Sequence, residues 1–256
     1  MILKNKNAVV TGCNRGIGKK ILEVFSLNGA TVFACVRNID NDFKSFLNDL
    51  KKRFNNEIIP IEFDLNNEEK IKDGANRIIL SNKPIDILVN NAATIHTAIF
   101  QMTSVKKLKE IFDVNFFSQT LFTQYILKSM IKNKKGSIVY ISSSSALDGN
   151  EGRNAYSSTK AAIIAQAKVL SREVGVHNIR VNSVAPGLTN TDMMKENHKK
   201  EIIKDVISRT SLRRIANPEE IANVVLLLSS DLTSYITGQV IRVDGGMWWI
   251  KMNKIK

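Results

Sequence analysis

The sequence predicts an α/β protein built as a single doubly wound domain, and two observations support this prediction. Short apolar runs alternate with amphipathic stretches almost from one end of the chain to the other. Such alternation is typical of βαβ units, which build a mainly parallel sheet with helices on both of its faces. The length of 256 residues suits one domain of this kind, and no linker or internal repeat divides residues 1–256.

Seven apolar runs have the length and the composition of buried strands. They span residues 8–10, 31–36, 58–63, 85–89, 137–141, 179–184 and 239–243. The stretches between them repeat their apolar residues at a helical period, as Phe43, Phe46, Leu47 and Leu50 do. Helices are expected from Ile17, over 43–54, 68–80, 105–132 and 154–176, and from Pro218, since proline suits the first turn of a helix.

Composition and charge exclude several classes of protein. A hydrophobic content of 43% excludes a disordered chain. We find no apolar span of membrane length and no secretion signal, so we expect a cytoplasmic protein without a membrane partner. Cys13 and Cys35 form no metal-binding motif, so no metal site is expected. The net charge of +13 is spread along the chain, which favours a solvated lysine-rich surface over a nucleic-acid interface.

A glycine-rich turn follows the first predicted strand and opens the first predicted helix. Its sequence, Thr11-Gly12-Cys13-Asn14-Arg15-Gly16-Ile17-Gly18, differs from the GxGxxG spacing in its wider first gap. Gly12 permits the tight turn, Gly16 lets the backbone approach a pyrophosphate, and Gly18 lets the helix lie close to the sheet. An ordinary strand–helix turn is the alternative, but this position favours a dinucleotide site contacted by Gly12, Asn14, Arg15, Gly16, Ile17 and Gly18.

The residues after the second and third strands indicate which dinucleotide is bound. The second strand ends without the carboxylate that would accept a hydrogen bond from the ribose hydroxyl of NAD. Arg37 stands there instead and, with Arg15, could hold the 2′-phosphate of NADP, so we expect NADP(H) in preference to NAD(H). Two surface arginines are the alternative interpretation. Asp64 and Leu65 follow the third strand, where the carboxylate could accept a hydrogen bond from the adenine amino group or could cap the next helix.

These residues together resemble the short-chain dehydrogenase/reductase family over nearly the whole chain. The shared motifs are Thr11-Gly12-x-x-x-Gly16-x-Gly18, Asp64, Asn90-Asn91-Ala92-Ala93, Asn115, Ser143, Tyr156-x-x-x-Lys160 and Pro186-Gly187. Each motif alone is common, but their order and separations are highly specific. The resemblance implies a Rossmann-type sheet of seven parallel strands in the order 3-2-1-4-5-6-7 and an NAD(P)-dependent exchange between alcohol and carbonyl. Residues 180–187 and 235–246 most resemble the 3-oxoacyl-[acyl-carrier-protein] reductases and the sugar dehydrogenases close to them.

The resemblance implies that Tyr156 and Lys160 carry the proton-transfer chemistry. Their spacing of four residues places both side chains on one face of a helix. A phenol titrates near 10, so a neighbouring ammonium would have to lower its pKa by about three units, which requires roughly 4 kcal/mol. Tyr156 would then exchange a proton with the substrate oxygen, while Lys160 would also hold the nicotinamide ribose. A half-buried tyrosine beside a snorkelling lysine is the alternative.

The resemblance also assigns roles to several other residues. Ser143 would polarise the substrate carbonyl, although Ser142, Ser144 and Ser145 leave the register open. Asn115 would hold a water linked to Lys160, or it could simply face solvent. The remaining expected cofactor contacts are Asn91 and Ala92 after the fourth strand, and Pro186, Gly187, Thr189 and Thr191 after the sixth.

Substrate choice and assembly are expected to depend on less regular segments. Residues 188–215 should form a mobile substrate lid. Related reductases attract an acidic acyl carrier with basic residues, and Lys134 falls near one such place, whereas His177 replaces an arginine at another. The adjacent Trp248 and Trp249 indicate an interface. The resemblance implies a homotetramer in which the two long helices pack across a two-fold axis.

The predicted function is that of an NADP(H)-dependent oxidoreductase that reduces a carbonyl to an alcohol, or the reverse, with a 3-oxoacyl thioester as the expected substrate. The alternative substrate is a sugar or nucleotide-sugar used in the synthesis of surface or flagellin glycans. A non-enzymatic NADP-binding regulator is the alternative of another class, but it would not need Tyr156, Lys160, Ser143 and Asn115.

Overall fold

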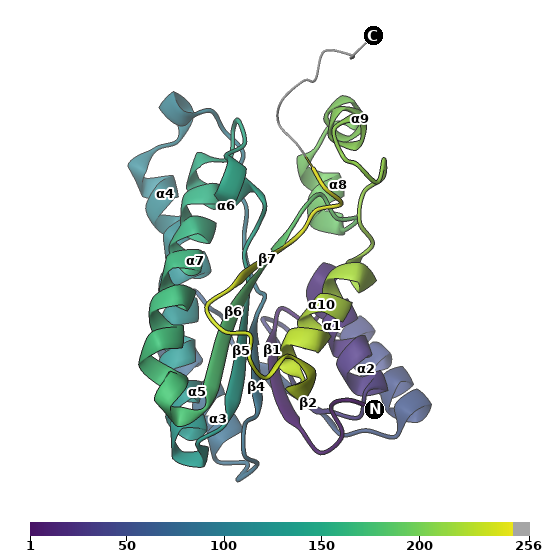
Figure 1. Cartoon of the computed structure of the whole chain (residues 1–256), viewed down its shortest axis with the longest axis vertical. Coiled ribbons are helices and arrows are strands. Elements are labelled where there is room, and N and C mark those ends of the chain that lie inside the picture. The colour runs from purple at the N-terminus through teal and green to yellow at the C-terminus, as the bar shows by residue number, and fades with distance from the viewer. Residues whose placement is uncertain (248–256) are drawn as a thin grey trace.

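The computed structural model describes residues 1–247 and contains one seven-stranded sheet in the order β3-β2-β1-β4-β5-β6-β7 (Figure 1). The strands are β1 (Asn7–Thr11), β2 (Thr31–Val36), β3 (Ile58–Glu62), β4 (Ile87–Asn90), β5 (Gly136–Ile141), β6 (Ile179–Pro186) and β7 (Val240–Val243). All six pairings between neighbours are parallel. The predicted fold class and strand order are therefore confirmed, whereas Trp248 and Trp249 lie outside the described residues.

Helices cover both faces of the sheet, as Figure 1 shows. One face carries α1 (Gly16–Leu27), α2 (Asn41–Phe54) and α10 (Pro218–Ser229), and the other carries α3 (Glu68–Ile79), α4 (Val105–Phe112), α5 (Ser118–Asn133) and α7 (Asn154–Val174). The connections contain the shorter helices α6 (Ser145–Asp148), α8 (Asp192–Asn197) and α9 (Lys200–Ser208), with turns η1 (Phe100–Met102), η3 (Gly175–His177) and η4 (Asp231–Thr233).

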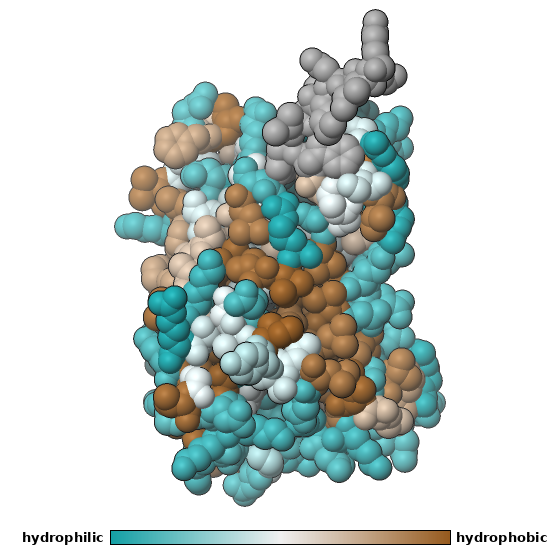
Figure 2. Space-filling view, viewed as in Figure 1, coloured by the Kyte–Doolittle hydropathy of each residue, from teal (hydrophilic) through white to brown (hydrophobic). Residues whose placement is uncertain are grey.

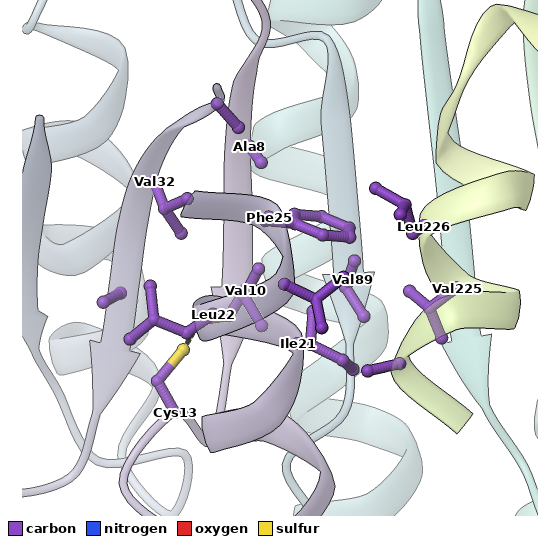
Figure 3. Packing of buried hydrophobic residues seen from close by; sticks show 14 of the residues in the cluster. Ala8, Val10, Cys13, Ile21, Leu22, Phe25, Val32, Val89, Val225 and Leu226 are labelled. Atoms are coloured by element: carbon purple, nitrogen blue, oxygen red, sulfur yellow. Dashed lines mark hydrogen bonds between the residues drawn. The ribbon is translucent and has the colours of Figure 1, made fainter. Parts of the chain in front are cut away.

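The central strands are buried on both faces, which explains why they read as continuous apolar runs. Along β1, Val10 joins the core beneath α1 and α10, whereas its neighbour Val9 joins the core beneath α3, α5 and α7. In Figure 3, Phe25 of α1 points toward Leu226 of α10 above the sheet. This packing holds α1 in place, and with it the glycine-rich turn at the N-terminus of that helix.

One predicted helix differs from the structure. The helix expected over 105–132 is divided by a π-helical turn, η2 (Asp113–Phe117), which carries Asn115 at its centre. Such turns are rare and occur mostly at functional sites. The spacing of apolar residues does not distinguish a single π-helical turn from continuous α-helix, so the sequence pattern could not reveal it.

The region 188–215, which was expected to form the substrate lid, contains α8 and α9. Isolated bridges join Thr189 to Ala216 and Thr210 to Met247, so this region is attached to the domain near both of its ends. Within residues 1–247, no helix is both long enough and apolar enough to cross a membrane.

Replacing Phe25 by alanine should destabilise the protein by about 3–5 kcal/mol, because this fully buried ring fills the layer between α1, α10 and the sheet. Urea denaturation followed by circular dichroism measures the change. Leu27→Ala is the matched control on the same helix: its side chain is 52% exposed, so its effect should stay within about 0.5 kcal/mol. Equal losses for the two variants would contradict this description of the core.

Candidate active site

A cleft of about 550 Å³ opens at the carboxyl ends of the central strands. It lies beside the point where the strand order reverses, between β1 and β4, which is where open α/β sheets bind their ligands. Its lining includes Thr11, Gly12, Asn14, Arg15, Gly16, Ile17, Gly18, Arg37, Asp64, Leu65, Asn91, Ala92, Tyr156, Lys160 and Thr191. Of the expected cofactor contacts, Pro186, Gly187 and Thr189 are not part of this lining.

The glycine-rich turn has the geometry of a phosphate cradle. Gly12 and Gly16 have φ values of +74° and +56°, a conformation that side chains with a Cβ rarely adopt. A Cβ on Gly18 would overlap the carbonyl oxygen of Gly12, so only glycine lets α1 approach the turn this closely. Arg15 precedes α1 without capping it, and the first turn of α1 has no acidic residue. The backbone amides at this helix end therefore suit a pyrophosphate.

Asn91 locks the glycine-rich turn to the segment that follows β4. Its amide donates to the carbonyl oxygens of Thr11 (2.9 Å) and Gly12 (3.3 Å). The hydroxyl of Thr11 in turn accepts hydrogen bonds from the backbone nitrogens of Asn91 and Ala92, each at 3.0 Å. The floor of the cleft is thus a fixed surface made by two separate stretches of chain.

Arg15 and Arg37, the two arginines expected to contact a 2′-phosphate, both line the cleft. Arg37 is exposed at the end of β2, lines the cleft and takes part in no ion pair with another residue of 1–247. Arg15 instead pairs with Glu196 of α8 at 3.1 Å. The end of β2 therefore presents one free guanidinium group, which is the donor set that a phosphate prefers.

Asp64 does not cap the helix that follows it. Asn67 is the N-cap of α3 and accepts a hydrogen bond from the backbone nitrogen of Lys70 at 3.0 Å. Asp64 lines the cleft, and its carboxylate accepts hydrogen bonds from the backbone (2.9 Å) and side chain (3.1 Å) of Asn66. The capping alternative is therefore wrong, while an adenine contact of Asp64 stays a prediction.

Tyr156 and Lys160 both reach the cleft from the first two turns of α7. The Lys160 ammonium nitrogen lies 5.7 Å from the centre of the Tyr156 ring and donates to the carbonyl oxygen of Ile141 at 2.7 Å. Only 1% of Lys160 is exposed. The lysine is thus buried beside the phenol, and the alternative of a snorkelling surface lysine is wrong.

The pKa shifts of this pair differ from the expected ones. Burial lowers the pKa of Lys160 to about 7. Burial also raises the pKa of Tyr156, while a hydrogen bond with Ser143 and the charge of Arg153 act in the opposite direction. The expected lowering of the Tyr156 pKa is absent because the cost of burying a phenolate outweighs these two contributions. A positively charged oxidised nicotinamide beside the phenol would act in the lowering direction.

The structure separates the roles of the neighbouring serines. The Ser143 hydroxyl is the one that hydrogen-bonds Tyr156, and it lies 2.8 Å from the Ser145 hydroxyl oxygen. The Ser142 hydroxyl instead donates to the carbonyl oxygen of Lys160 at 2.9 Å. Of these serines, Ser143 is therefore the one beside the Tyr156 phenol, and its contact with a substrate oxygen stays a prediction.

Asn115 connects the segment after β4 to α7. It is fully buried, so the solvent-facing alternative is wrong. Its amide nitrogen donates to the carbonyl oxygen of Thr94 (2.8 Å) and to the Thr159 hydroxyl (3.2 Å), and its amide oxygen accepts from the backbone nitrogen of Thr94 (2.8 Å). The π-helical turn points this side chain inward, and a water held between Asn115 and Lys160 stays a prediction.

The residues after β6 divide into two groups. Thr191 lines the cleft and caps α8 by accepting from the backbone nitrogen of Met194 at 3.2 Å. The carbonyl oxygen of Pro186 accepts a hydrogen bond from the backbone nitrogen of Ser144. The backbone nitrogen of Gly187 donates to the carbonyl oxygen of Val243. The Thr189 hydroxyl donates to the carbonyl oxygen of Gly187 at 3.0 Å. Pro186, Gly187 and Thr189 thus fix the backbone between β6 and Thr191, and only Thr191 lines the cleft.

Sequence reasoning missed several residues at this site, and three of them interact with the predicted catalytic residues. Thr94 and Thr159 hold Asn115, and threonines at such positions carry no distinctive signal. Arg153, which directly precedes α7, is buried near Tyr156, and its position three residues before that tyrosine could have drawn attention to it. No group of three or more His, Cys, Asp or Glu side chains in residues 1–247 could hold a metal ion.

Comparison with known proteins agrees with this geometry. A family model described as "Enoyl-(Acyl carrier protein) reductase" matches residues 12–248. The chain is 38% identical to 3-oxoacyl-[acyl-carrier-protein] reductases from Chlamydia muridarum (over 249 residues) and Aquifex aeolicus (over 253 residues), covering 96% of this chain and 98% of each relative. It is 35% identical to a 3alpha-hydroxysteroid dehydrogenase from Mediterraneibacter gnavus, with the same two coverages.

A solved structure of a short chain dehydrogenase/reductase family protein superposes on this chain with a TM-score of 0.84. The two sequences are 30% identical, and the match covers 96% of this chain and 98% of the solved one. With the strand order, the glycine-rich turn and the Tyr156–Lys160 pair in one cleft, the chain belongs to the short-chain dehydrogenase/reductase family and is an oxidoreductase of CH–OH and C=O groups.

Proposed function

We propose that the chain is a cytoplasmic, NADPH-dependent reductase of 3-oxoacyl thioesters. The observation that carries this proposal is the placement of Tyr156 and Lys160 in the dinucleotide cleft, with Ser143 beside the phenol. The names of the relatives reported above add the 3-oxoacyl substrate, and they give no support to a sugar oxidoreductase or a non-enzymatic regulator. NADP(H), in preference to NAD(H), follows from the free Arg37 at the end of β2.

Each side chain contributes one step to the reduction. When bound, NADPH supplies the hydride that the carbonyl carbon accepts. Ser143 donates a hydrogen bond to the carbonyl oxygen, and Tyr156 transfers its phenolic proton to that oxygen as the alcohol forms. This transfer leaves a phenolate on Tyr156. The ammonium form of Lys160, which donates to the carbonyl oxygen of Ile141, stabilises that phenolate. In the oxidation direction, the Tyr156 phenolate accepts the proton instead.

Residues 188–215 would form the lid of this site. Thr191, Asp192 and Met193 line the cleft, so α8 begins at its edge, which supports a lid here. A carrier-bound substrate would approach along this side. Lys134, in a left-handed conformation between α5 and β5, lies at the amino ends of the strands, opposite the cleft, so it gives no support to carrier docking beside this site.

A homotetramer would cover two separate apolar surfaces. The outer side of α5 has a groove lined by Leu121, Tyr125, Leu127 and Ile131, and Val169 of the adjoining α7 is 57% exposed. Figure 2 shows a second apolar patch in the middle of one face, where Figure 1 places β7 and α10. Two different self-complementary patches are what a tetramer with three two-fold axes requires.

Tyr156→Phe should abolish turnover of acetoacetyl thioesters, with a loss of roughly 10²–10⁴-fold expected for a missing general acid. NADPH absorbance at 340 nm measures turnover, and NADPH fluorescence should show binding within about threefold of wild type, since only one hydroxyl is removed. Tyr235→Phe is the matched control, because Tyr235 is fully exposed. Full activity of Tyr156→Phe, or an inactive wild type, would refute the proposed reaction.

Arg37→Leu should raise the Kd of NADPH roughly 10- to 100-fold, because a charge-assisted hydrogen bond to the 2′-phosphate is lost. The Kd of NADH should change little, since NADH lacks that phosphate. Fluorescence titration with both dinucleotides measures this. Arg53→Leu, an exposed arginine of α2 outside the cleft, is the control. Equal effects on NADPH and NADH would show that Arg37 does not select the phosphate.

Val169→Glu should convert the tetramer to dimers. A carboxylate buried between subunits would destabilise the interface formed by α5 and α7, whereas the interface formed by the β7–α10 patch would remain. Sedimentation velocity measures the mass against that of the 28.7 kDa chain. Leu80→Glu, at the end of α3 and 75% exposed, is the control and should remain tetrameric. A monomeric wild type would contradict the proposed assembly.

A further inference from the structure

Arg153 is a buried cation that the reaction described above does not use. It directly precedes α7, three residues before Tyr156, and only 6% of its surface is exposed. It forms no ion pair with a carboxylate of residues 1–247. Burial and the positive end of the helix dipole both oppose this charge. Its retention therefore requires specific compensating contacts.

Those contacts join three segments of the chain: the segment after β4, the end of α8 and the start of α7. One guanidinium nitrogen donates to the Thr97 hydroxyl, in the segment after β4. The other lies 3.1 Å from the carbonyl oxygen of Asn197 and 3.0 Å from Nε2 of His198, at the C-terminal end of α8. The neighbouring Gly152 carbonyl oxygen accepts from the backbone nitrogen of Ala98 at 3.0 Å. Arg153 thus ties α8 and the segment after β4 to the start of α7.

His198 completes this arrangement as a neutral acceptor. Its Nδ1 lies 3.2 Å from the carbonyl oxygen of Met194, so Nδ1 carries the proton and Nε2 accepts from Arg153. Burial and the charge of Arg153 both lower the pKa of His198, which favours this neutral form. The guanidinium is therefore held entirely by neutral oxygen and nitrogen acceptors, and its positive charge is not cancelled locally.

The uncancelled charge acts on Tyr156. It opposes the burial that raises the pKa of Tyr156, and Tyr156 in turn acts against the burial that lowers the pKa of Arg153. Burial lowers the pKa of Lys160 to about 7, so desolvation disfavours the charged form of this lysine. An arginine keeps its proton under the same conditions. Arg153 is thus the more constant of the two positive charges near the phenol.

We propose that Arg153 is a positioning residue for the carbonyl–alcohol reaction inferred above, on which this role rests. Its guanidinium fixes α8 and the segment after β4 around Tyr156, and its charge favours the phenolate form of that tyrosine. Arg153 does not line the dinucleotide cleft, so it acts through Tyr156 and α8 and not through the cofactor.

Titration of Tyr156 by nuclear magnetic resonance tests whether the charge of Arg153 favours the phenolate. With 13C at Cζ, the four tyrosines of the chain give four signals, and Tyr156→Phe identifies the one of interest. In Arg153→Gln, Tyr156 should titrate at a higher pH than in wild type, because the opposing charge is gone. Arg153→Lys keeps the charge and should titrate close to wild type. Arg180→Gln is the matched control: Arg180 also donates to neutral acceptors, Thr233, Ile236 and Ser230, but on the β6–η4 side.

Hydrogen exchange across α8 tests whether Arg153 holds this helix in place. Both Arg153→Gln and Arg153→Lys should speed exchange in residues 192–197 roughly tenfold, because neither side chain reproduces the planar fork. Thr97→Val, which removes one acceptor, should act in the same direction and replaces Arg153→Gln if that variant does not fold. A wild-type titration of Tyr156 in Arg153→Gln, or unchanged exchange in α8, overturns the proposal.

Turnover provides a separate readout. With an active thioester, Arg153→Gln should lower kcat/KM roughly 10- to 100-fold through misplacement of Tyr156, while the KM for NADPH stays unchanged. The titration and exchange measurements need no substrate. A wild type that reduces no thioester would therefore refute the proposed function, whereas the role of Arg153 would still be decided by Tyr156 and α8.

Discussion

The close approach of α1 to the end of β1 is the constraint on which the rest of the site depends. Gly18 has no room for a Cβ against the Gly12 carbonyl, and the Asn91 amide holds both Thr11 and Gly12 from the other side. The contact of Phe25 with α10 keeps the helix in that position. Any residue larger than glycine at 18 would move the helix end away from the phosphate position.

From this contact, hydrogen bonds continue across the sheet to the reacting groups. The Gln119 amide donates to the carbonyl oxygen of Ala92 at 2.5 Å, next to the residue that locks the turn. Two residues further, Thr94 is held by Asn115, which also bonds Thr159 beside Lys160. The distance between the phosphate cradle and Tyr156 is therefore set by hydrogen bonds of buried and half-buried side-chain amides. The dinucleotide and the proton donor are positioned by the same network.

The spacing of residues was enough to predict most of this arrangement. Buried strands appear as continuous apolar runs, so β1 to β7 could be found without alternation, and carboxyl ends of parallel strands meet at one edge. That edge brings Gly12, Arg37, Asp64 and Asn91 together, as their positions after four successive strands had indicated. Spacing could not show that the helix around Asn115 contains a π-helical turn, because a single turn is too short to change the apolar pattern recognisably.

Burial is the quantity that spacing could not supply, and it decides the electrostatics of the site. The sequence placed an ammonium beside a phenol and so predicted a lowered Tyr156 pKa, but in the structure Lys160 is buried and Tyr156 is half-buried. Desolvation then disfavours the charged form of each, raising the pKa of Tyr156 and lowering that of Lys160 to about 7. A lysine whose charged form is disfavoured by burial is a weaker counter-charge. A second cation that stays protonated when buried, such as Arg153, is what such a pair needs, and its neutral acceptors leave its charge available to the phenol.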